Sequence, residues 1–262
     1  MKRALSLVVA ILVSACATVG GPAVTPAAKA ELAPTGTLRV GLIAVNPLYV
    51  TQNTPPGETR GIAIDIANRL AGRIGVPMKP VLYPSVGPLM AAAGKDEWDI
   101  TFLPINPERA TMMNFTAPFV YGETSFLVGR DSTAKGFGDL DHSGKTIVAV
   151  IRSTEEEWLR ANARSATVVT ASSPVAAREM LKEGKVDAYA SLTANLDEVS
   201  RHIPGSRILA GSFRDAPIAM AVIKVRPSAD AFASEFIDQL NASGVVGEWI
   251  AREKLVGVRA AK

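Results

Sequence analysis

Residues 94–119 constrain the fold of this 262-residue chain more than any other stretch. The run 98–102 has the apolar pattern of a short buried strand, and 115–119 is a second short element that Pro118 keeps from continuing as a helix. Signals for a helix start stand between these two elements. A strand followed at once by a helix start is typical of an α/β sheet.

The expected helix start places an arginine just past the strand end. Asn106 suits the N-cap, Pro107 the first helical position and Glu108 the first turn. Arg109 is then expected to project from that first turn. Since α/β sheets bind ligands at this edge, beside exposed N–H groups, Arg109 is the leading candidate to bind an anion through its guanidinium fork.

Strand and helix patterns alternate through the rest of the chain. Residues 62–74 carry an apolar residue at every fourth position from Ile62 to Ile74, which predicts an amphipathic helix ended by Gly75. Further strands are expected at 38–43, 78–83, 146–151 and 186–191, and further helices at 86–93, 174–182, 227–240 and 248–254. The last residues of the chain are expected to be frayed.

The first part of the chain has the pattern of a targeting segment. Residues 1–15 combine a basic start with an apolar run too short to span a bilayer, which predicts a signal peptide. Residues 13–16 resemble the bacterial lipobox, which implies cleavage before Cys16 and lipid on that residue; secretion with an incidental cysteine is the alternative. Residues 16–36 lack apolar periodicity and are expected to be the lipidated cysteine and a flexible tether.

Charge and composition exclude several classes of function. The formal net charge of +3 falls to +1 without Lys2 and Arg3, and no long basic run remains, so nucleic acid is not an expected partner. Cys16 is the single cysteine, so no disulfide forms within the chain. With only His142 and His202 available, a Cys/His metal cluster is excluded, and neither a metal nor a cofactor is expected.

Four motifs follow one another in a fixed order along the chain. They are GTLRVG at 36–41, GIAIDIA at 61–67, NPER at 106–109 followed by FTAPF at 115–119, and GKVDA at 184–188. In this order they resemble the family 3 solute-binding proteins of ABC importers, over about residues 36–250. Four motifs in register over that length make the resemblance specific.

The resemblance implies the α/β fold of a type II periplasmic binding protein, with two lobes that are each a mostly parallel sheet flanked by helices. Lobe 1 is expected at 37–125 plus 225–262, lobe 2 at 130–217, and the two hinge crossings at 125–129 and 218–224. It also implies a periplasmic or extracytoplasmic monomer, lipid-anchored to a membrane, that binds a small molecule between its lobes and delivers it to an ABC permease.

The family's cleft suggests ligand contacts on the first lobe. Its loop after the first strand lines the cleft, which makes Asn46 and Tyr49 candidates; a Tyr49 packed into the core is the alternative. Asn106 stands where the amino-acid binders of the family carry threonine. It also follows Asp99 by seven residues, about two fewer than in those proteins. The floor of the cleft is therefore expected to be reshaped, with Arg109 in place.

On the second lobe, the family holds the α-carboxylate of its ligand with backbone N–H groups of one turn. Arg152 replaces the usual glycine of that turn, which puts a second guanidinium beside the cleft. Ser153 and Thr154 follow as candidate ligand contacts. Both also suit a capping box, with Glu156 and Glu157 respectively, and capping alone is the alternative role.

Leu192 is the largest departure from the family's pattern. The amino-acid binders have an aspartate here, five residues after the one at Asp187, and it takes the ligand's ammonium group. A buried unpaired ammonium costs on the order of several kcal/mol, so common polar amino acids are expected to bind poorly in the usual pose. Thr193 or Asn195 is a partial substitute. Glu123 is expected near the cleft mouth, either solvated or facing a cationic ligand group.

Other functions remain open at this point. The alternative to ligand binding by Arg109 is a structural role, in which it pairs with a neighbouring acidic side chain and stabilises the lobe. An enzyme resembling the periplasmic cyclohexadienyl (arogenate) dehydratases is the main rival, with Glu123 as its candidate general acid or base. A receptor that presents its ligand to a signalling partner is the third possibility.

Overall fold

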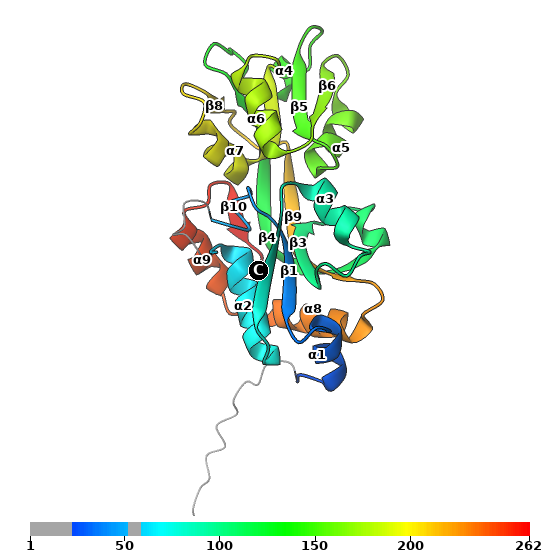
Figure 1. Cartoon of the computed structure of the whole chain (residues 1–262). Helices are drawn as coiled ribbons and strands as arrows, with labels where there is room; N and C mark the ends of the chain where they lie inside the picture. The colour runs from blue at the N-terminus through cyan, green and yellow to red at the C-terminus, as the bar shows by residue number, and fades with distance from the viewer. Residues whose placement is uncertain (1–22, 52–58) are drawn as a thin grey trace, which may run out of the picture.

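The computed structural model describes residues 23–51 and 59–262, so the expected signal peptide at 1–15 and lipidation site at Cys16 lie outside the described residues. The described strands join into one hydrogen-bonded sheet in the order β2-β1-β3-β9-β4-β7-β5-β6. Helices gather around its two ends and form a lower and an upper lobe in Figure 1. The two-lobed α/β arrangement expected from the sequence is confirmed.

The lower lobe contains the first strands of the chain and its last helices. Strand β1 (Leu38–Ile43) lies between β2 (Met78–Tyr83) and β3 (Ile100–Pro104), and all three run parallel. The helices of this lobe are α1 (Pro26–Leu32), α2 (Ile62–Ile74), α3 (Val86–Ala92), α8 (Pro227–Ala242) and α9 (Val245–Glu253).

The upper lobe repeats this pattern with the middle part of the chain. Strand β5 (Thr146–Val150) lies between β6 (Thr167–Ala171) and β7 (Ala188–Leu192), again in parallel. Its helices are α4 (Phe137–Leu140), α5 (Thr154–Asn162), α6 (Pro174–Lys182) and α7 (Thr193–Ser200). Each lobe therefore has a mostly parallel sheet, as expected.

Two long antiparallel strands connect the lobes: β4 (Met113–Val128) and β9 (Arg214–Ile223). In the lower lobe β9 pairs with β3, and in the upper lobe β4 pairs with β7. The segment 218–222 therefore lies within the lower half of the sheet and 124–128 within the upper half. We place the passage between the lobes near 121–124 and 214–217, a few residues before the crossings expected at 125–129 and 218–224.

Strand β4 is longer than the sequence indicated, and two short strands pair with it. The element expected separately at 115–119 is part of β4, because this segment continues the pairing with β9 across a β-bulge. The carboxy-terminal residues, expected to be frayed, form β10 (Val258–Ala260), which pairs with β4. Strand β8 (Arg207–Ile208) pairs with the upper end of β4.

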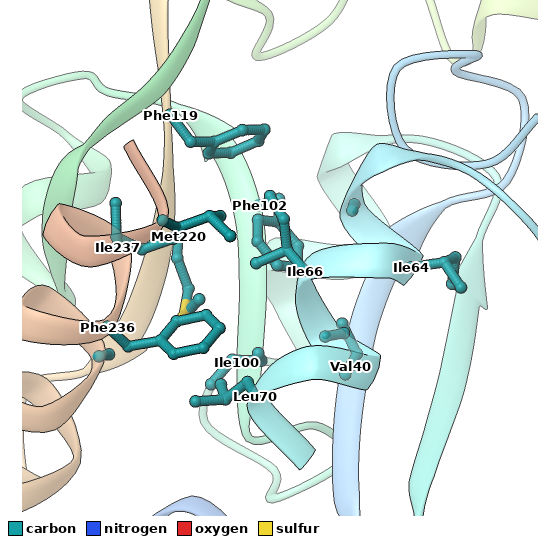
Figure 2. Packing of buried hydrophobic residues seen from close by; sticks show 14 of the residues in the cluster. Val40, Ile64, Ile66, Leu70, Ile100, Phe102, Phe119, Met220, Phe236 and Ile237 are labelled. Atoms are coloured by element: carbon teal, nitrogen blue, oxygen red, sulfur yellow. The ribbon is translucent and has the colours of Figure 1, made fainter. Parts of the chain in front are cut away.

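The lower-lobe core forms around α2, whose expected amphipathic pattern is confirmed. Ile66 and Leu70 of α2 are buried among Phe102 of β3 and Phe236 of α8, as Figure 2 shows. Gly75 ends this helix in the left-handed conformation, at a φ of 67°. The upper lobe has two smaller apolar clusters, one on each face of its sheet, because alternate residues of a strand point to opposite faces.

The prediction of a flexible tether at 16–36 is wrong for residues 26–32, because these residues form helix α1. The Thr25 hydroxyl caps this helix, and Leu32 is buried in the lower-lobe core. The Glu31 carboxylate accepts the Ala229 N–H at 2.8 Å, near the start of α8, where a negative charge is favourable. A helix this short depends on tertiary packing, which local composition does not reveal.

Leu32→Ala is expected to lower the free energy of unfolding by about 2–5 kcal/mol, because it removes buried methyl groups and leaves a cavity. Leu32 is 0% exposed, whereas Leu82 of β2 is 49% exposed, so Leu82→Ala is a matched control. Leu82→Ala should lower the free energy of unfolding by less than about 1 kcal/mol. Urea unfolding followed by circular dichroism measures both losses, and equal losses would contradict the packing of α1.

Candidate functional site

A cavity of about 70 Å³ lies between the lobes, at the carboxyl ends of parallel strands from both. Ile43 and Pro104 end β1 and β3 of the lower lobe, and Val150 and Leu192 end β5 and β7 of the upper lobe. All four line the cavity. Open α/β sheets bind ligands at this edge, so the topology alone makes the cavity the candidate site.

Most candidate residues from the sequence meet at this cavity. Its lining includes Asn46, Tyr49, Arg109, Ser153, Thr154 and Leu192. The candidates Asn106, Arg152 and Glu123 do not line it. Asn106 and Arg152 nevertheless contact cavity residues, as described below, whereas Glu123 is exposed and donates its backbone N–H to the Gly257 carbonyl at 2.7 Å. Glu123 as a cleft residue is therefore wrong, and its solvated alternative holds.

The turn that carries Arg109 is shorter than expected. A single 3₁₀ turn, η1 (Arg109–Thr111), replaces the expected helix, because the chain enters β4 at Met113. The capping role of Asn106 is confirmed, since its side-chain oxygen accepts the Arg109 N–H at 2.8 Å. This cap fixes the backbone of Arg109 at the rim of the sheet.

The Arg109 guanidinium is buried and held by carbonyl groups of both lobes. Arg109 is 4% exposed. Its Nη1 donates to the Pro104 carbonyl at 2.8 Å, and its Nη2 donates to the Arg152 carbonyl of the upper lobe at 2.9 Å. Its other donors have no protein partner among the described residues. Burial lowers the pKa of Arg109, but an arginine side chain keeps its proton in proteins.

A second contact across the cleft joins Asn106 to Glu157 of α5, whose carboxylate accepts from the Asn106 amide. Asn106 thus links the lobes instead of lining the cavity. Together with the bond from Arg109 to Arg152, this contact forms only when the lobes meet. The structure therefore shows a closed arrangement of the two lobes.

The start of α5 faces the cavity. The Ser153 hydroxyl accepts the Glu156 N–H at 3.1 Å, and the Glu156 carboxylate accepts the Arg152 N–H at 2.5 Å. Capping by Ser153 is thus confirmed, while Glu156 reaches one residue further back than in a capping box. Arg152 keeps the left-handed conformation, at a φ of 63°, that its family position usually gives to glycine. The Arg152 residue is exposed, so it contributes its carbonyl and not a second guanidinium.

Two hydroxyl groups in the cavity wall have no partner in the described part of the chain. They belong to Tyr49 and Thr154, and both are buried. Tyr49 therefore fulfils both expectations, since its ring belongs to the lower-lobe core and its residue lines the cavity. Burial raises the pKa of Tyr49, which keeps its hydroxyl neutral. Buried polar groups seldom lack a partner, so these hydroxyls indicate a place for a polar ligand.

The upper wall of the cavity combines an apolar and a polar part. Leu192 is buried against Gly122, where an added Cβ would lie 2.8 Å from the leucine side chain. Next to it, the Asn195 amide donates to the Tyr189 hydroxyl at 3.1 Å and to the Ser191 hydroxyl at 2.9 Å. Tyr189 and Ser191 line the cavity and were not identified from the sequence.

Glu155 also lines the cavity and was missed by sequence reasoning. It is 6% exposed, and it forms no ion pair among the described residues. Burial raises its pKa, and its own N–H, the Ser153 hydroxyl and the charges of Arg109 and Arg214 oppose that effect in part. Tyr49 lines the same cavity, and the charge of Glu155 adds to the effect of burial in raising the pKa of Tyr49.

Glu155 stood within a run of three glutamates, 155–157, at the start of an expected helix. Such a run usually marks a solvated helix face with favourable charges near the helix dipole. The usable signal was its position directly after Ser153 and Thr154, because a helix that starts at the cleft turns its first residues toward the ligand space.

Groups for other chemistries are not assembled in the described ranges, 23–51 and 59–262. No set of three or more acidic, histidine or cysteine side chains there has the grouping of a metal site. The described helices also include none that is long and apolar enough to cross a bilayer.

Residues 38–250 match the profile of the bacterial extracellular solute-binding proteins, family 3. The chain belongs to this family. The matched segment covers both lobes and the residues of the interlobe cavity. The family resemblance noted in the sequence is therefore confirmed.

Curated relatives include binding proteins and one enzyme. The L-cystine-binding protein TcyJ of Escherichia coli is 28% identical over 159 residues, 58% of this chain and 58% of that protein. The ABC transporter glutamine-binding protein GlnH of Bacillus subtilis is 27% identical over 229 residues, 84% of each chain. The cyclohexadienyl dehydratase of Pseudomonas aeruginosa is 29% identical over 139 residues, 51% of each chain. The chain thus spans just over half the length of the first and the last of these.

A mutant of ArgBP from T. maritima is among the similar solved structures. It superimposes with a TM-score of 0.75 at 25% identity, covering 87% of this chain and 99% of that chain. The type II periplasmic binding fold expected from the sequence is thereby confirmed.

Glu155→Gln is expected to stabilise the unliganded protein more at pH 8 than at pH 4. Because burial raises the pKa of Glu155, the folded state binds this proton more tightly than the unfolded chain. Stability is therefore lost as the pH rises from the unfolded pKa through the folded pKa, and glutamine avoids this loss.

Melting temperatures of the wild type and the variant at pH 4, 6 and 8 test this expectation. Glu235→Gln, at an exposed position of α8, is the matched control. Its melting temperature should stay close to that of the wild type at all three pH values. A gain for Glu155→Gln that is the same at every pH would contradict the assignment.

Proposed function

We propose that this chain is the extracytoplasmic solute-binding protein of an ABC importer, which captures a small polar metabolite with a carboxylate group and delivers it to a membrane permease. The buried guanidinium of Arg109, with unused donors at a cavity between two lobes, is the observation that carries this proposal. An arginine fork binds two carboxylate oxygens at once, and it does so most strongly away from water. Relatives named for binding L-cystine and glutamine support a small carboxylate ligand.

Closure of the two lobes would couple binding to recognition by the permease. Contacts from Arg109 and Asn106 to the upper lobe exist only in the closed arrangement. A ligand that touches both walls of the cavity favours that arrangement by its differential affinity for the closed state. The permease then reads the closed form, which is populated mainly when ligand is bound.

The proposal includes a location outside the cytoplasm for a monomer held at a membrane by lipid on Cys16. The apolar start of the chain and the small residues before this cysteine support it. Two or more acyl chains would hold the folded lobes at a membrane stably.

A dehydratase related to the cyclohexadienyl enzyme is a second candidate function. The observation in its favour is Glu155, a carboxyl group in the cavity whose pKa is raised by burial, as a general acid requires. Turnover of prephenate or arogenate by the wild type, lost in Glu155→Gln, would favour the enzyme over the binding protein.

Arg109→Ala is expected to abolish ligand-induced thermal stabilisation while the fold is retained. Removal of a buried charged donor from a ligand carboxylate should weaken binding by about 100-fold or more. The wild type is first screened by thermal shift against the common L-amino acids, L-cystine, 2-hydroxy acids and dicarboxylates. Hits are then titrated into the variant by calorimetry.

Arg164→Ala is the matched control, because Arg164 is exposed and its side chain lies outside the cavity. The control should bind as the wild type does, and the far-ultraviolet spectra of all three proteins should agree. An unchanged melting shift in Arg109→Ala would remove this arginine from the site and end the proposal.

A further inference from the structure

The interlobe cavity is small for the ligands that are named in two relatives of this chain. Its volume is about 70 Å³. A dry protein cavity of about 150 Å³ holds a single benzene molecule, so this cavity has room for about six non-hydrogen atoms at most. Glutamine and L-cystine, for which the two relatives are named, are both larger than that. The fit of a ligand therefore depends on how firmly the walls of the cavity are held.

The lower wall is held at Tyr49, which is 1% exposed and belongs to the lower-lobe core. Local bonds fix the loop that carries it. The Tyr49 N–H donates to the Asn46 carbonyl at 2.9 Å, and the Asn46 side chain accepts the Leu48 N–H at 3.0 Å. Behind this loop, an added Cβ at Gly61 would lie 2.3 Å from the Tyr49 carbonyl oxygen. Tyr49 therefore cannot move back without displacing the start of α2.

The upper wall is held at Leu192, the last residue of β7. Leu192 pairs with Thr124 of β4 in the sheet and is 6% exposed. Although it comes from the upper lobe, it packs in the apolar cluster that forms the lower-lobe core. Its side chain also lies against Gly122 of β4. Leu192 therefore closes the side of the cavity next to the crossing strands, and it has no free space to turn into while the lobes are closed.

Polar groups from both lobes line the space between these walls. Arg109 and the Tyr49 hydroxyl belong to the lower lobe, and the Thr154 hydroxyl belongs to the upper lobe. Both hydroxyls lack a partner in the described part of the chain. Because a buried polar group without a partner is unfavourable, a ligand should offer polar atoms to both lobes. A short molecule can do so in this space, whereas a longer one would have to push packed side chains apart.

We propose that the cavity selects carboxylates of two or three carbons that carry one further polar group, and that Leu192 sets this limit against the fixed wall at Tyr49. The inference rests on the proposed function and defines its substrate class by size. Each methylene group beyond the limit would overfill the closed cavity, and overfilling forces neighbouring side chains into strained positions.

Three series of unbranched acids test the limit in the wild type by calorimetry. They are the 2-hydroxy, 2-oxo and L-2-amino acids, each extended by one methylene group at a time from two to six carbons. Every member of a series keeps the carboxylate and the same second polar group, so only the size changes. The tightest ligand should have two or three carbons, and the five-carbon member of its series should bind about tenfold or more weakly.

Leu192→Ala tests the residue that sets the limit. Truncation opens the upper wall, so the ratio of five-carbon to three-carbon affinity should rise about tenfold or more, and Leu192→Val should shift this ratio in the same direction by less. Leu196→Ala is the matched control, because Leu196 lies one turn further along in α7, is 0% exposed and does not line the cavity. The control should leave the ratio unchanged. Melting curves first show that each protein is folded.

Each outcome decides the question. A wild type that binds five-carbon acids, L-glutamine or L-cystine as tightly as the shorter acids would overturn the size limit. An unchanged ratio in folded Leu192→Ala and Leu192→Val would overturn the role of Leu192. The proposed function would survive both results, because Arg109 would still hold a carboxylate. Absence of binding to every carboxylate probe would overturn the proposed function together with the size limit.

Discussion

A guanidinium closed between two lobes is the interaction on which the rest of this structure depends. The Arg109 side chain is buried, yet it is held by the carbonyl groups of Pro104 and Arg152 and by no carboxylate of the described residues. Carbonyl dipoles orient the fork without neutralising its charge, which keeps it able to bind an anion. The bond to Arg152 also ties the lower lobe to the upper one, so the position of the guanidinium and the closed arrangement depend on each other.

The scaffold brings this site together through two continuous strands. Strands β4 and β9 run through both lobes (Figure 1). The passage is packed closely on its sides. An added Cβ at Gly122 would lie 2.8 Å from Leu192, and one at Gly257 would lie 2.6 Å from Thr193. Small residues are thus required where the end of the chain and the start of α7 approach the crossing. The connection between the lobes is therefore a ribbon of two paired strands and not a pair of loose loops.

Charged and uncharged polar side chains of both lobes meet in the lining of the cavity. Arg109 stands on the lower wall and Glu155 on the upper one, and the unpartnered hydroxyl groups of Tyr49 and Thr154 lie in the same lining. Burial makes each charge costly when it is alone and strong when it is paired. A polar group that stays buried without a partner is unfavourable, so such a lining selects small molecules by their polar groups as well as by their shape.

Local pattern in the sequence determined the elements that carry their own signals. Apolar spacing and a terminal glycine located α2, and the run after Gly94 placed Arg109 at a strand end capped by Asn106. Such signals are readable because helix periodicity and capping act over a few residues.

Tertiary structure decided what depends on distant partners. Helix α1 forms because Leu32 finds a core and Glu31 finds the start of α8, and neither partner is near in sequence. The expected helix after Asn106 shrank to one turn because β4 had to pair with β9. Glu155 lines the cavity, and Glu123 is exposed, because of the way in which the lobes meet. Burial is a property of the whole fold, and a run of glutamates does not show which of them will lose its water.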